Sequence, residues 1–363
     1  MKATKIILAG GFLGAGKTTL LWSAAQRLMQ KGLKVGLITN DQAPELVDSA
    51  LLTQKGLTVS EVNGSCFCCN FNGFIQAAQA LREKSQVDVI IAEPVGSCTD
   101  LSATILQPLK KHWREQLDLA PLTVLADPIR LASTLSGGSA GLHKDAAYIY
   151  RKQLEESDII LITKTKKYAP DYIVSLKERA ARAYPFATVL SADSISGKGL
   201  DEWMEVALHR KDAGLRIAAV DYDVYAHGEA VLGWLNGTLT LQGKSADWNT
   251  FCSELLGELS ARFTQASCTV GHVKLIAENG NRYIAGNLTD SSSRPATTGS
   301  MESCDEIRLT INARVETSPE NLSSIVKDTL DSLVKDKYSA QTLAWRCLSP
   351  GRPNPTYRFD AVC

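Results

Sequence analysis

Residues Gly10-Gly11-Phe12-Leu13-Gly14-Ala15-Gly16-Lys17-Thr18-Thr19 decide the fold of this 363-residue chain. An apolar run at residues 6–9, typical of a buried strand, precedes them, and apolar residues recur at helical spacing over residues 19–31. A strand, the spacing Gly-x-x-x-x-Gly-Lys-Thr and a helix together form the pattern of a phosphate-binding P-loop. The alternative is a glycine-rich turn that only connects strand to helix, but it leaves the Lys-Thr pair unexplained.

The residue types of this loop suit the binding of a nucleotide. Glycines let backbone N–H groups point toward phosphate oxygens, and the helix N-terminus adds partial positive charge. We expect Lys17 to reach the β- and γ-phosphates and the Thr18 hydroxyl to bind Mg²⁺. The predicted nucleotide-binding residues of the loop are Gly11, Gly14, Ala15, Gly16, Lys17, Thr18 and Thr19.

Composition narrows the class of protein. Lys plus Arg is 39 and Asp plus Glu is 39, so the zero net charge argues against nucleic acid or a membrane as the main partner. The sequence contains no run of eighteen apolar residues and no signal peptide pattern, and we expect a cytoplasmic protein. In that compartment its nine cysteines are better explained by metal binding or redox chemistry than by disulfides.

The first 214 residues alternate apolar strands with helical segments, which predicts an α/β domain with a doubly wound, mostly parallel sheet. Ligands of such sheets bind at the carboxyl ends of the strands, where the P-loop lies. The expected strands after the first are 33–39, 87–93, 122–127, 158–164 and 187–192. The expected helices are 73–83, a stretch near 101–117, 145–155, 171–183 and 199–209.

Two expected strands end in acidic residues. Asp41 follows the strand at 33–39, where it either reaches Mg²⁺ or a catalytic water, or belongs to a turn; Asp48 is a weaker candidate. Glu93 ends the strand at 87–93 and is expected to hold the Mg²⁺ water shell or to orient the attacking water. Gly96 lets the backbone approach the γ-phosphate.

Three cysteines lie within four residues at Cys66-Phe67-Cys68-Cys69. In an extended segment Cys66 and Cys68 point to one side, and a turn brings in Cys69. Three thiolates suit Zn²⁺, Co²⁺ or Cu(I), and the incomplete shell suits transfer of the ion more than a structural site. The alternative is a set of small buried side chains. Cys98 is either an additional thiolate or, more simply, a small residue.

Taken together, these motifs resemble the CobW-type P-loop GTPases, relatives of the urease and hydrogenase nickel-insertion GTPases. The resemblance covers about residues 5–205 and rests on the P-loop, Asn40-Asp41, Glu61-x-Asn-Gly-x-Cys66-x-Cys68-Cys69, Glu93-x-x-Gly96, and Gln153 with the strand from Asp158. It implies GTP as the nucleotide, a metal bound at the cysteine motif, and delivery of that metal to a client metalloprotein. A cobalamin-related pathway is part of the same expectation, and homodimerisation stays open.

One stretch departs from the family pattern. Guanine-specific members carry Asn-Lys-x-Asp, whose carboxylate accepts two hydrogen bonds from guanine, and this chain has Thr163-Lys164-Thr165-Lys166. By resemblance Lys164 stacks on the base and Ser191 belongs to the second base-contact loop. Lys166 offers donors where an acceptor is needed, so we expect ATP to compete with GTP.

From residue 215 the pattern changes to open alternation, which predicts a second, smaller α+β domain over 215–340. The expected strands are 225–241, 270–277, 283–288 and 307–315, and the expected helices are 248–263 and 319–334. Asn279-Gly280 predicts a hairpin turn. Residues 341–363 are expected to form an extended Pro-rich tail, either for docking or simply packed. His227 and His272 each stand alone, which favours structural roles.

The sequence therefore predicts a cytoplasmic, Mg²⁺-dependent nucleoside triphosphatase that chaperones or inserts a metal, with Zn²⁺ or Co²⁺ as cargo. Lys17, Glu93 and Asp41 are the expected catalytic residues, and Cys66, Cys68 and Cys69 the cargo ligands. One alternative is an ATP-driven activator or maturation partner of a corrinoid or other metalloenzyme, in which the thiols do redox work. Another is a nucleotide switch with little turnover.

Overall fold

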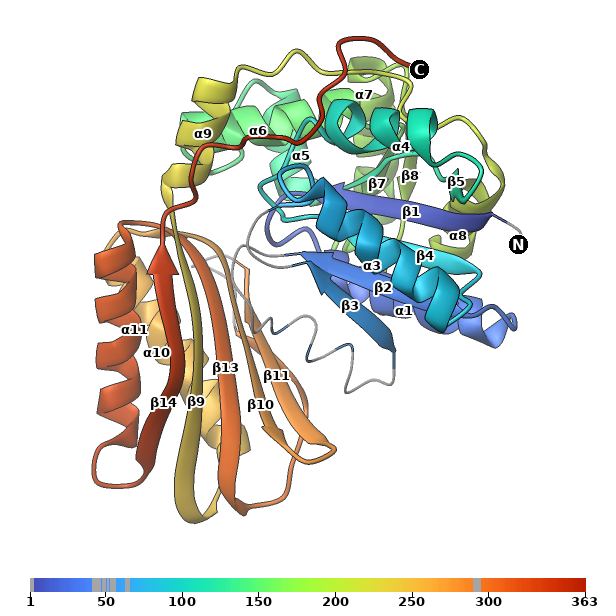
Figure 1. Cartoon of the computed structure of the whole chain (residues 1–363). Coiled ribbons are helices and arrows are strands. Elements are labelled where there is room, and N and C mark those ends of the chain that lie inside the picture. The colour runs from blue at the N-terminus through green and yellow to red at the C-terminus, as the bar shows by residue number, and fades with distance from the viewer. Residues whose placement is uncertain are drawn as a thin grey trace. The chain divides into compact units, whose positions relative to one another are not determined.

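The computed structural model describes residues 3–40, 47, 50, 52, 57–62, 66–289 and 295–363. These residues belong to two compact units (Figure 1). The first unit contains the N-terminal strands, Leu57–Gly228 and the C-terminal segment Arg352–Cys363. The second is built mainly from Glu229–Gly351. None of the helices in the described ranges has the length and apolar character needed to cross a bilayer.

The first unit is built on a parallel sheet with the strand order β3-β2-β4-β1-β6-β7-β8, and the short β5 pairs with the beginning of β1. Residues along β1, β2, β4, β6 and β7 are buried throughout, which explains their nearly continuous Val, Ile and Leu content. The strands are β1 (Thr4–Gly11), β2 (Val35–Asn40), β3 (Thr58–Val62), β4 (Val89–Glu93), β5 (Leu117–Leu119), β6 (Thr123–Ala126), β7 (Ile159–Ile162) and β8 (Thr188–Ser191).

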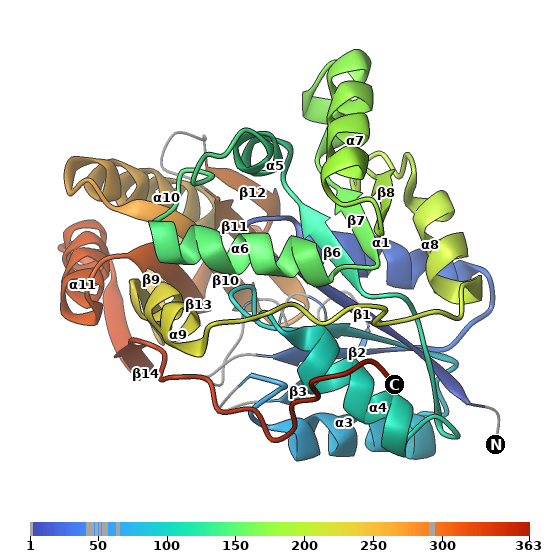
Figure 2. The ribbon, with the colours of Figure 1, turned by 90° about the horizontal axis from the view of Figure 1, so that it is seen from above.

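Helices cover both faces of this sheet, and α3 and α8 lie on opposite faces (Figures 1 and 2). The helices are α1 (Lys17–Gln30), α3 (Phe71–Lys84), the π-helical turn Ser102–Leu106, α4 (Gln107–His112), α5 (Pro128–Leu135), α6 (Lys144–Glu156), the 3₁₀ turn Thr165–Lys167, α7 (Pro170–Ala183), α8 (Leu200–His209) and α9 (Tyr222–Ala230). The predicted doubly wound α/β fold is confirmed.

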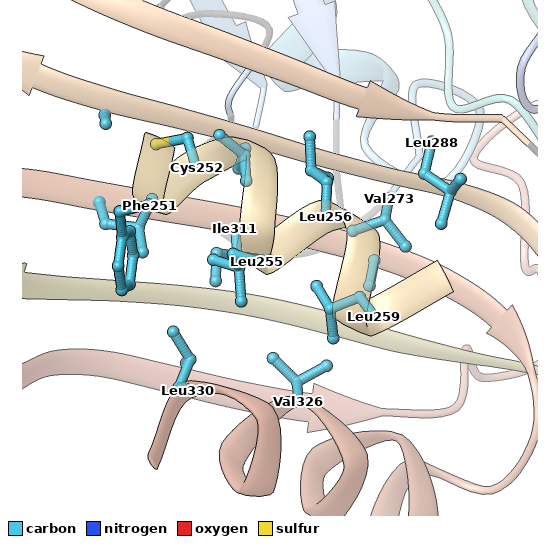
Figure 3. Close-up of a cluster of buried hydrophobic side chains, with 14 of the residues drawn as sticks. Phe251, Cys252, Leu255, Leu256, Leu259, Val273, Leu288, Ile311, Val326 and Leu330 are labelled. Atoms are coloured by element: carbon cyan, nitrogen blue, oxygen red, sulfur yellow. The ribbon is translucent and has the colours of Figure 1, made fainter. Parts of the chain in front are cut away.

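The second unit is an antiparallel sheet in the order β12-β11-β10-β13-β9-β14, with two helices. Side chains of α10, of α11 and of the strands meet in one apolar cluster (Figure 3). The predicted hairpin is confirmed, because β10 and β11 pair from Asn279 opposite Arg282 and Gly280 adopts a positive φ. The elements are β9 (Leu232–Ala246), α10 (Trp248–Gln265), β10 (Thr269–Asn279), β11 (Arg282–Leu288), β12 (Ala296–Gly299), β13 (Cys304–Glu316), α11 (Pro319–Val334) and β14 (Ser339–Leu348).

The structure corrects two expectations at the C-terminal end. The strand expected from Tyr225 begins only at Leu232, because Asp221 accepts hydrogen bonds from the N–H groups of Asp223 and Val224 and so caps α9. The extended tail expected from residue 341 begins only after Leu348, because β14 pairs with β9 before the first proline, Pro350. The remaining prolines lie in the segment that returns to the first unit.

Glu156, the last residue of α6, fixes the segment that follows β4. Its buried carboxyl group accepts hydrogen bonds from the Thr99 hydroxyl at 3.0 Å and the Ser102 N–H at 2.8 Å. Burial, with the nearby charge of Asp100, raises the pKa of Glu156 to about 8. The carboxyl group is therefore largely neutral in the folded chain at neutral pH.

This shift predicts how stability depends on pH. The folded pKa of Glu156 lies above its ordinary value of 4.5, so its stabilising contribution is complete below pH 4.5 and is lost as pH rises through about 8. Glu156→Gln cannot ionise, so as pH rises from about 4.5 to about 8 its melting temperature should fall less than that of the wild type. Calorimetry at a series of pH values measures this difference. Glu155→Gln, at the exposed neighbouring position, should behave as the wild type does; equal declines in all three proteins would contradict the assignment.

Candidate functional site

The loop between β1 and α1 has a backbone that only glycine adopts easily. Gly11, Gly14 and Gly16 have φ values of 129°, 76° and 89°. A Cβ atom at Gly11 would lie 2.5 Å from the Leu125 carbonyl oxygen, whereas one at Gly16 would meet nothing within 4 Å. The loop is thus packed tightly at its start and open where α1 begins, which is where a phosphate group would be received.

Lys17 and Thr18 are buried at the start of α1, and Thr19 is exposed. The Lys17 ammonium group donates to the carbonyl oxygens of Gly11 at 2.9 Å and Phe12 at 3.5 Å. It also lies 3.9 Å from a carboxylate oxygen of Glu93, at the end of β4. The structure thus places the Lys17 ammonium group near the Glu93 carboxylate, and Thr18 follows Lys17 in the first turn of α1.

The backbone at Gly96 lies directly against the P-loop. A Cβ atom there would lie 2.7 Å from Leu13 Cδ2, 3.0 Å from Lys17 Nζ and 3.2 Å from the Leu13 backbone nitrogen. The Gln153 side-chain amide holds this segment from α6, because it donates to the carbonyl oxygens of Gly96 at 3.1 Å and Cys98 at 2.7 Å. Any residue larger than glycine at position 96 would displace the segment or the P-loop.

The three thiols of the cysteine motif form one cluster. The Sγ atoms of Cys66 and Cys68 are 2.9 Å apart, those of Cys66 and Cys69 are 3.2 Å apart, and those of Cys68 and Cys69 are 3.7 Å apart. Hydrogen bonds from Cys68 and Cys69 hold the pKa of the Cys66 thiol well below its usual range. The hydrogen bond to Cys66 raises the pKa of Cys69 to about 11. The thiol of Cys98 also hydrogen-bonds to Cys66 and Cys68.

Asn40, the last residue of β2, positions the cysteine motif. Its buried side chain donates to the Val62 carbonyl oxygen at 2.7 Å and accepts from the Phe67 N–H at 2.8 Å. One amide group thereby joins the end of β2, the end of β3 and the first turn of the motif. Asn70 then caps α3 by accepting from the Gly73 N–H at 3.1 Å.

The C-terminal segment Arg352–Cys363 packs against the cysteine motif within the same unit. The Asn354 N–H donates to the Sγ atom of Cys69 at 3.2 Å, and the Thr356 N–H donates to the Cys68 carbonyl oxygen at 2.8 Å. The Arg358 guanidinium group donates to the buried Asp100 carboxylate at 2.8 Å. The segment therefore contacts both the motif and the chain that follows Gly96.

The predicted base-contact residues lie at the ends of β7 and β8. The Lys164 ammonium group pairs with the Asp127 carboxylate at 3.0 Å, and the Lys166 side chain is exposed. The Lys166 N–H donates to the Asp193 carboxylate at 3.3 Å, two residues after Ser191. Asp193 is therefore an acidic group beside the position where guanine-specific proteins have their aspartate.

Sequence reasoning missed three features of this site. Asp41 and Asp48 lie outside the described residues, while the structure assigns positioning contacts to their neighbour Asn40. The contact of the C-terminal segment with Cys69 comes from a backbone N–H, which leaves no sequence signal. Asp193 was detectable, since it follows the predicted loop at Ser191.

Comparisons with known proteins agree with these motifs. Residues 5–191, more than half of the chain, match the family model described as CobW/HypB/UreG, nucleotide-binding domain. The chain is 28% identical to the zinc chaperone YeiR of Escherichia coli over 174 residues, which cover 46% of this chain and 48% of YeiR. It is 32% identical to the E. coli zinc chaperone YjiA over 78 residues, 22% of this chain and 24% of YjiA. The alignments thus span half or less of these relatives.

Solved structures give weaker likenesses. Nickel-bound HypB from Helicobacter pylori has a TM-score of 0.41 and 19% identity, with coverage of 58% of this chain and 87% of HypB. Zn(II)-bound YjiA from E. coli has a TM-score of 0.37 and 15% identity, with coverage of 92% and 99%. With TM-scores this low, we assign no property of these proteins to this chain. The match over residues 5–191 establishes that the chain belongs to the CobW/HypB/UreG family.

Proposed function

We propose that this protein is a Mg²⁺-dependent nucleoside triphosphatase that couples nucleotide binding and hydrolysis to the binding of a thiophilic divalent ion and its delivery to a client metalloprotein. The observation that carries the proposal is the cluster of three thiols in the same compact unit as the P-loop. Zinc chaperones among the similar proteins support a metal as cargo. The chemistry of the described residues supports each part.

The P-loop residues suit phosphate binding and charge stabilisation. Lys17 is already directed into the loop by its hydrogen bonds to loop carbonyl groups, and a phosphate group would take their place. Bound Mg²⁺ would neutralise charge on the phosphates, and the Thr18 hydroxyl is its expected protein ligand. Glu93, whose carboxylate lies 3.9 Å from the Lys17 ammonium group, would accept a hydrogen bond from a water molecule near the γ-phosphate.

The cysteine cluster suits an ion such as Zn²⁺ or Co²⁺. Sulfur ligands of a tetrahedral zinc site lie about 2.3 Å from the ion and hence about 3.8 Å from one another. The observed separations of 2.9, 3.2 and 3.7 Å need to widen by only about 1 Å or less to accept the ion. Three protein ligands leave a position open, which allows a client ligand to take over the ion.

Coupling between the two sites would run through the segment after β4. Gly96 touches the P-loop, and Cys98 hydrogen-bonds to the cysteine motif. The Gln153 side chain donates to the backbone carbonyl oxygens of both Gly96 and Cys98. A γ-phosphate that displaces Gly96 would therefore also displace Cys98 relative to Cys66. This link favours a metal-handling protein over a protein whose cysteines act independently of the nucleotide.

Loss of the P-loop lysine tests the hydrolytic part. Lys17→Ala removes a buried positive charge at the phosphates and should reduce turnover by about 100-fold or more. Thr18→Ala should raise the Mg²⁺ concentration needed for half-maximal turnover. Steady-state phosphate release measures both effects, with the exposed Lys31→Ala variant as control. Undiminished turnover of Lys17→Ala would exclude hydrolysis at this loop.

Cobalt spectroscopy tests the cargo site. Wild-type protein should bind one Co²⁺ with thiolate-to-cobalt charge-transfer absorption, and Cys66→Ser, Cys68→Ser and Cys69→Ser should each weaken binding by about tenfold or more, or about 1.4 kcal/mol. The exposed Cys363→Ser is the matched control and should change nothing. A weaker charge-transfer absorption in Cys98→Ser would show that Cys98 is a fourth sulfur ligand of the Co²⁺ ion. Unchanged charge transfer in the triple Cys66, Cys68 and Cys69 variant would place the cargo site elsewhere.

Nucleotide competition tests the base preference. A guanine bound in a pocket without a carboxylate acceptor loses about 1–3 kcal/mol of binding free energy, because its N–H donors stay unpaired. We therefore expect the wild type to prefer GTP over ATP only weakly. Lys166→Asp should strengthen that preference by about 10- to 100-fold. Lys167→Asp, the exposed neighbour, is the control. Competition binding with labelled nucleotide measures the ratio. A wild-type preference of about 1,000-fold for GTP would contradict the expectation and point to Asp193 as the acceptor, which Asp193→Asn would then test.

A further inference from the structure

A second cluster of metal-ligating side chains lies in the first unit. His143 precedes α6, Asp145 lies in its first turn, and His227 belongs to α9. Ligand atoms of the three side chains all lie within 4.8 Å of one another. His227 is therefore not alone, although more than 80 residues separate it from its two partners in the sequence.

Asp145 contacts both imidazoles: its carboxylate hydrogen-bonds to His227, and its backbone N–H donates to His143 Nδ1 at 3.3 Å. Asp145 Oδ2 lies 2.5 Å from His227 Nδ1 and 3.7 Å from His143 Nδ1. The two imidazole rings meet edge to face with centroids 5.6 Å apart. The side chains of His143, Asp145 and His227 are 31%, 16% and 60% exposed, so an ion in solution can reach them.

Contacts other than the His227–Asp145 pair hold α9 in this position. A Cβ atom at Gly228 would lie 2.5 Å from the Asp145 carbonyl oxygen, so glycine is needed for the close approach of α9 to α6. The Asp221 N–H donates to the Tyr148 hydroxyl at 2.6 Å, and the buried Tyr225 hydroxyl accepts from the Thr99 N–H at 3.2 Å. These contacts hold α9 so that the His227 imidazole lies beside Asp145. The site is therefore formed before an ion binds.

We propose that His143, Asp145 and His227 form a second binding site for a borderline divalent transition-metal ion, with Zn²⁺ as the representative ion. Two imidazoles and a carboxylate are a ligand set that zinc accepts, and the three leave a coordination position open. Zinc bonds of about 2.0–2.2 Å place ligand atoms about 3.3 Å apart. The distances of 2.5 and 3.7 Å therefore have to change by less than about 1 Å.

Metal binding at this site replaces the hydrogen bond between His227 Nδ1 and Asp145 Oδ2 with bonds from both atoms to the ion. Imidazole binds a metal as the neutral ring, so a neutral His227 that binds through Nδ1 carries its one proton on Nε2, and the proton count does not change. No sulfur takes part, so the site should bind Zn²⁺ more weakly than the three thiols and exchange it readily.

Zinc titration of the full-length, untagged protein tests the proposal. Calorimetry should detect two equivalents of Zn²⁺ in the wild type, the weaker of which is lost or weakened by at least tenfold in His227→Ala and in Asp145→Asn. His209→Ala is the matched control, because His209 forms an ordinary surface pair with Glu205 at 3.3 Å and should retain both equivalents. In ¹⁵N spectra of the imidazoles, His143 and His227 should shift when the second equivalent is added, and His209 should not.

The outcomes separate this site from the proposed cargo site. Persistence of the weaker equivalent in His227→Ala, or its equal loss in His209→Ala, would overturn the inference. So would imidazole resonances of His143 and His227 that do not move. The triple Cys66→Ser, Cys68→Ser and Cys69→Ser variant should keep the weaker equivalent while it loses the tighter one. Retention of the tighter equivalent there would count against the cargo proposal alone.

Discussion

The contact between Gly96 and the P-loop is the constraint on which the rest of the first unit depends. With no room for a Cβ atom between residue 96 and Leu13 or Lys17, the chain that leaves β4 is held against the phosphate-binding loop. Two residues later the same chain brings Cys98 to the cysteine motif, and α6 fastens it through Gln153. A change at the phosphate position therefore reaches the thiols through two residues of chain and the hydrogen bonds of Cys98.

Buried carboxyl groups secure the far end of this segment. Asp100 has a positive φ of 62°, which a non-glycine residue adopts only when its surroundings hold it. Here those surroundings are the Tyr222 hydroxyl of α9 and the Arg358 guanidinium group, each 2.8 Å from the carboxylate. The C-terminal segment thus stabilises the chain after β4 at Asp100 and the cysteine motif at Cys69. Glu156 adds a largely neutral carboxyl group beside them.

Features that depend on residues close together in the sequence could be predicted, and contacts between residues far apart in the sequence could not. The P-loop, the parallel strands and the Cys66-Phe67-Cys68-Cys69 motif are local patterns, and the structure has the predicted fold around them. Helix α9 was missed because its cap is a single aspartate, Asp221, before a Tyr- and Val-containing stretch that also suits a strand. The contacts of Asn354 with Cys69 and of His227 with Asp145 join distant positions, and no spacing rule reveals them. Long-range packing decides such contacts, so they need coordinates.

The central claim is that the nucleotide at the P-loop and the ion at the cysteine motif affect each other. The most direct measurement is the dissociation constant of Co²⁺, followed by thiolate charge-transfer absorption, in the presence of Mg²⁺ with either GDP or a non-hydrolysable GTP analogue. The account predicts about a tenfold or larger difference between the two nucleotide states, with a reciprocal change in nucleotide affinity when Co²⁺ is bound. Equal Co²⁺ affinities in both states would contradict it.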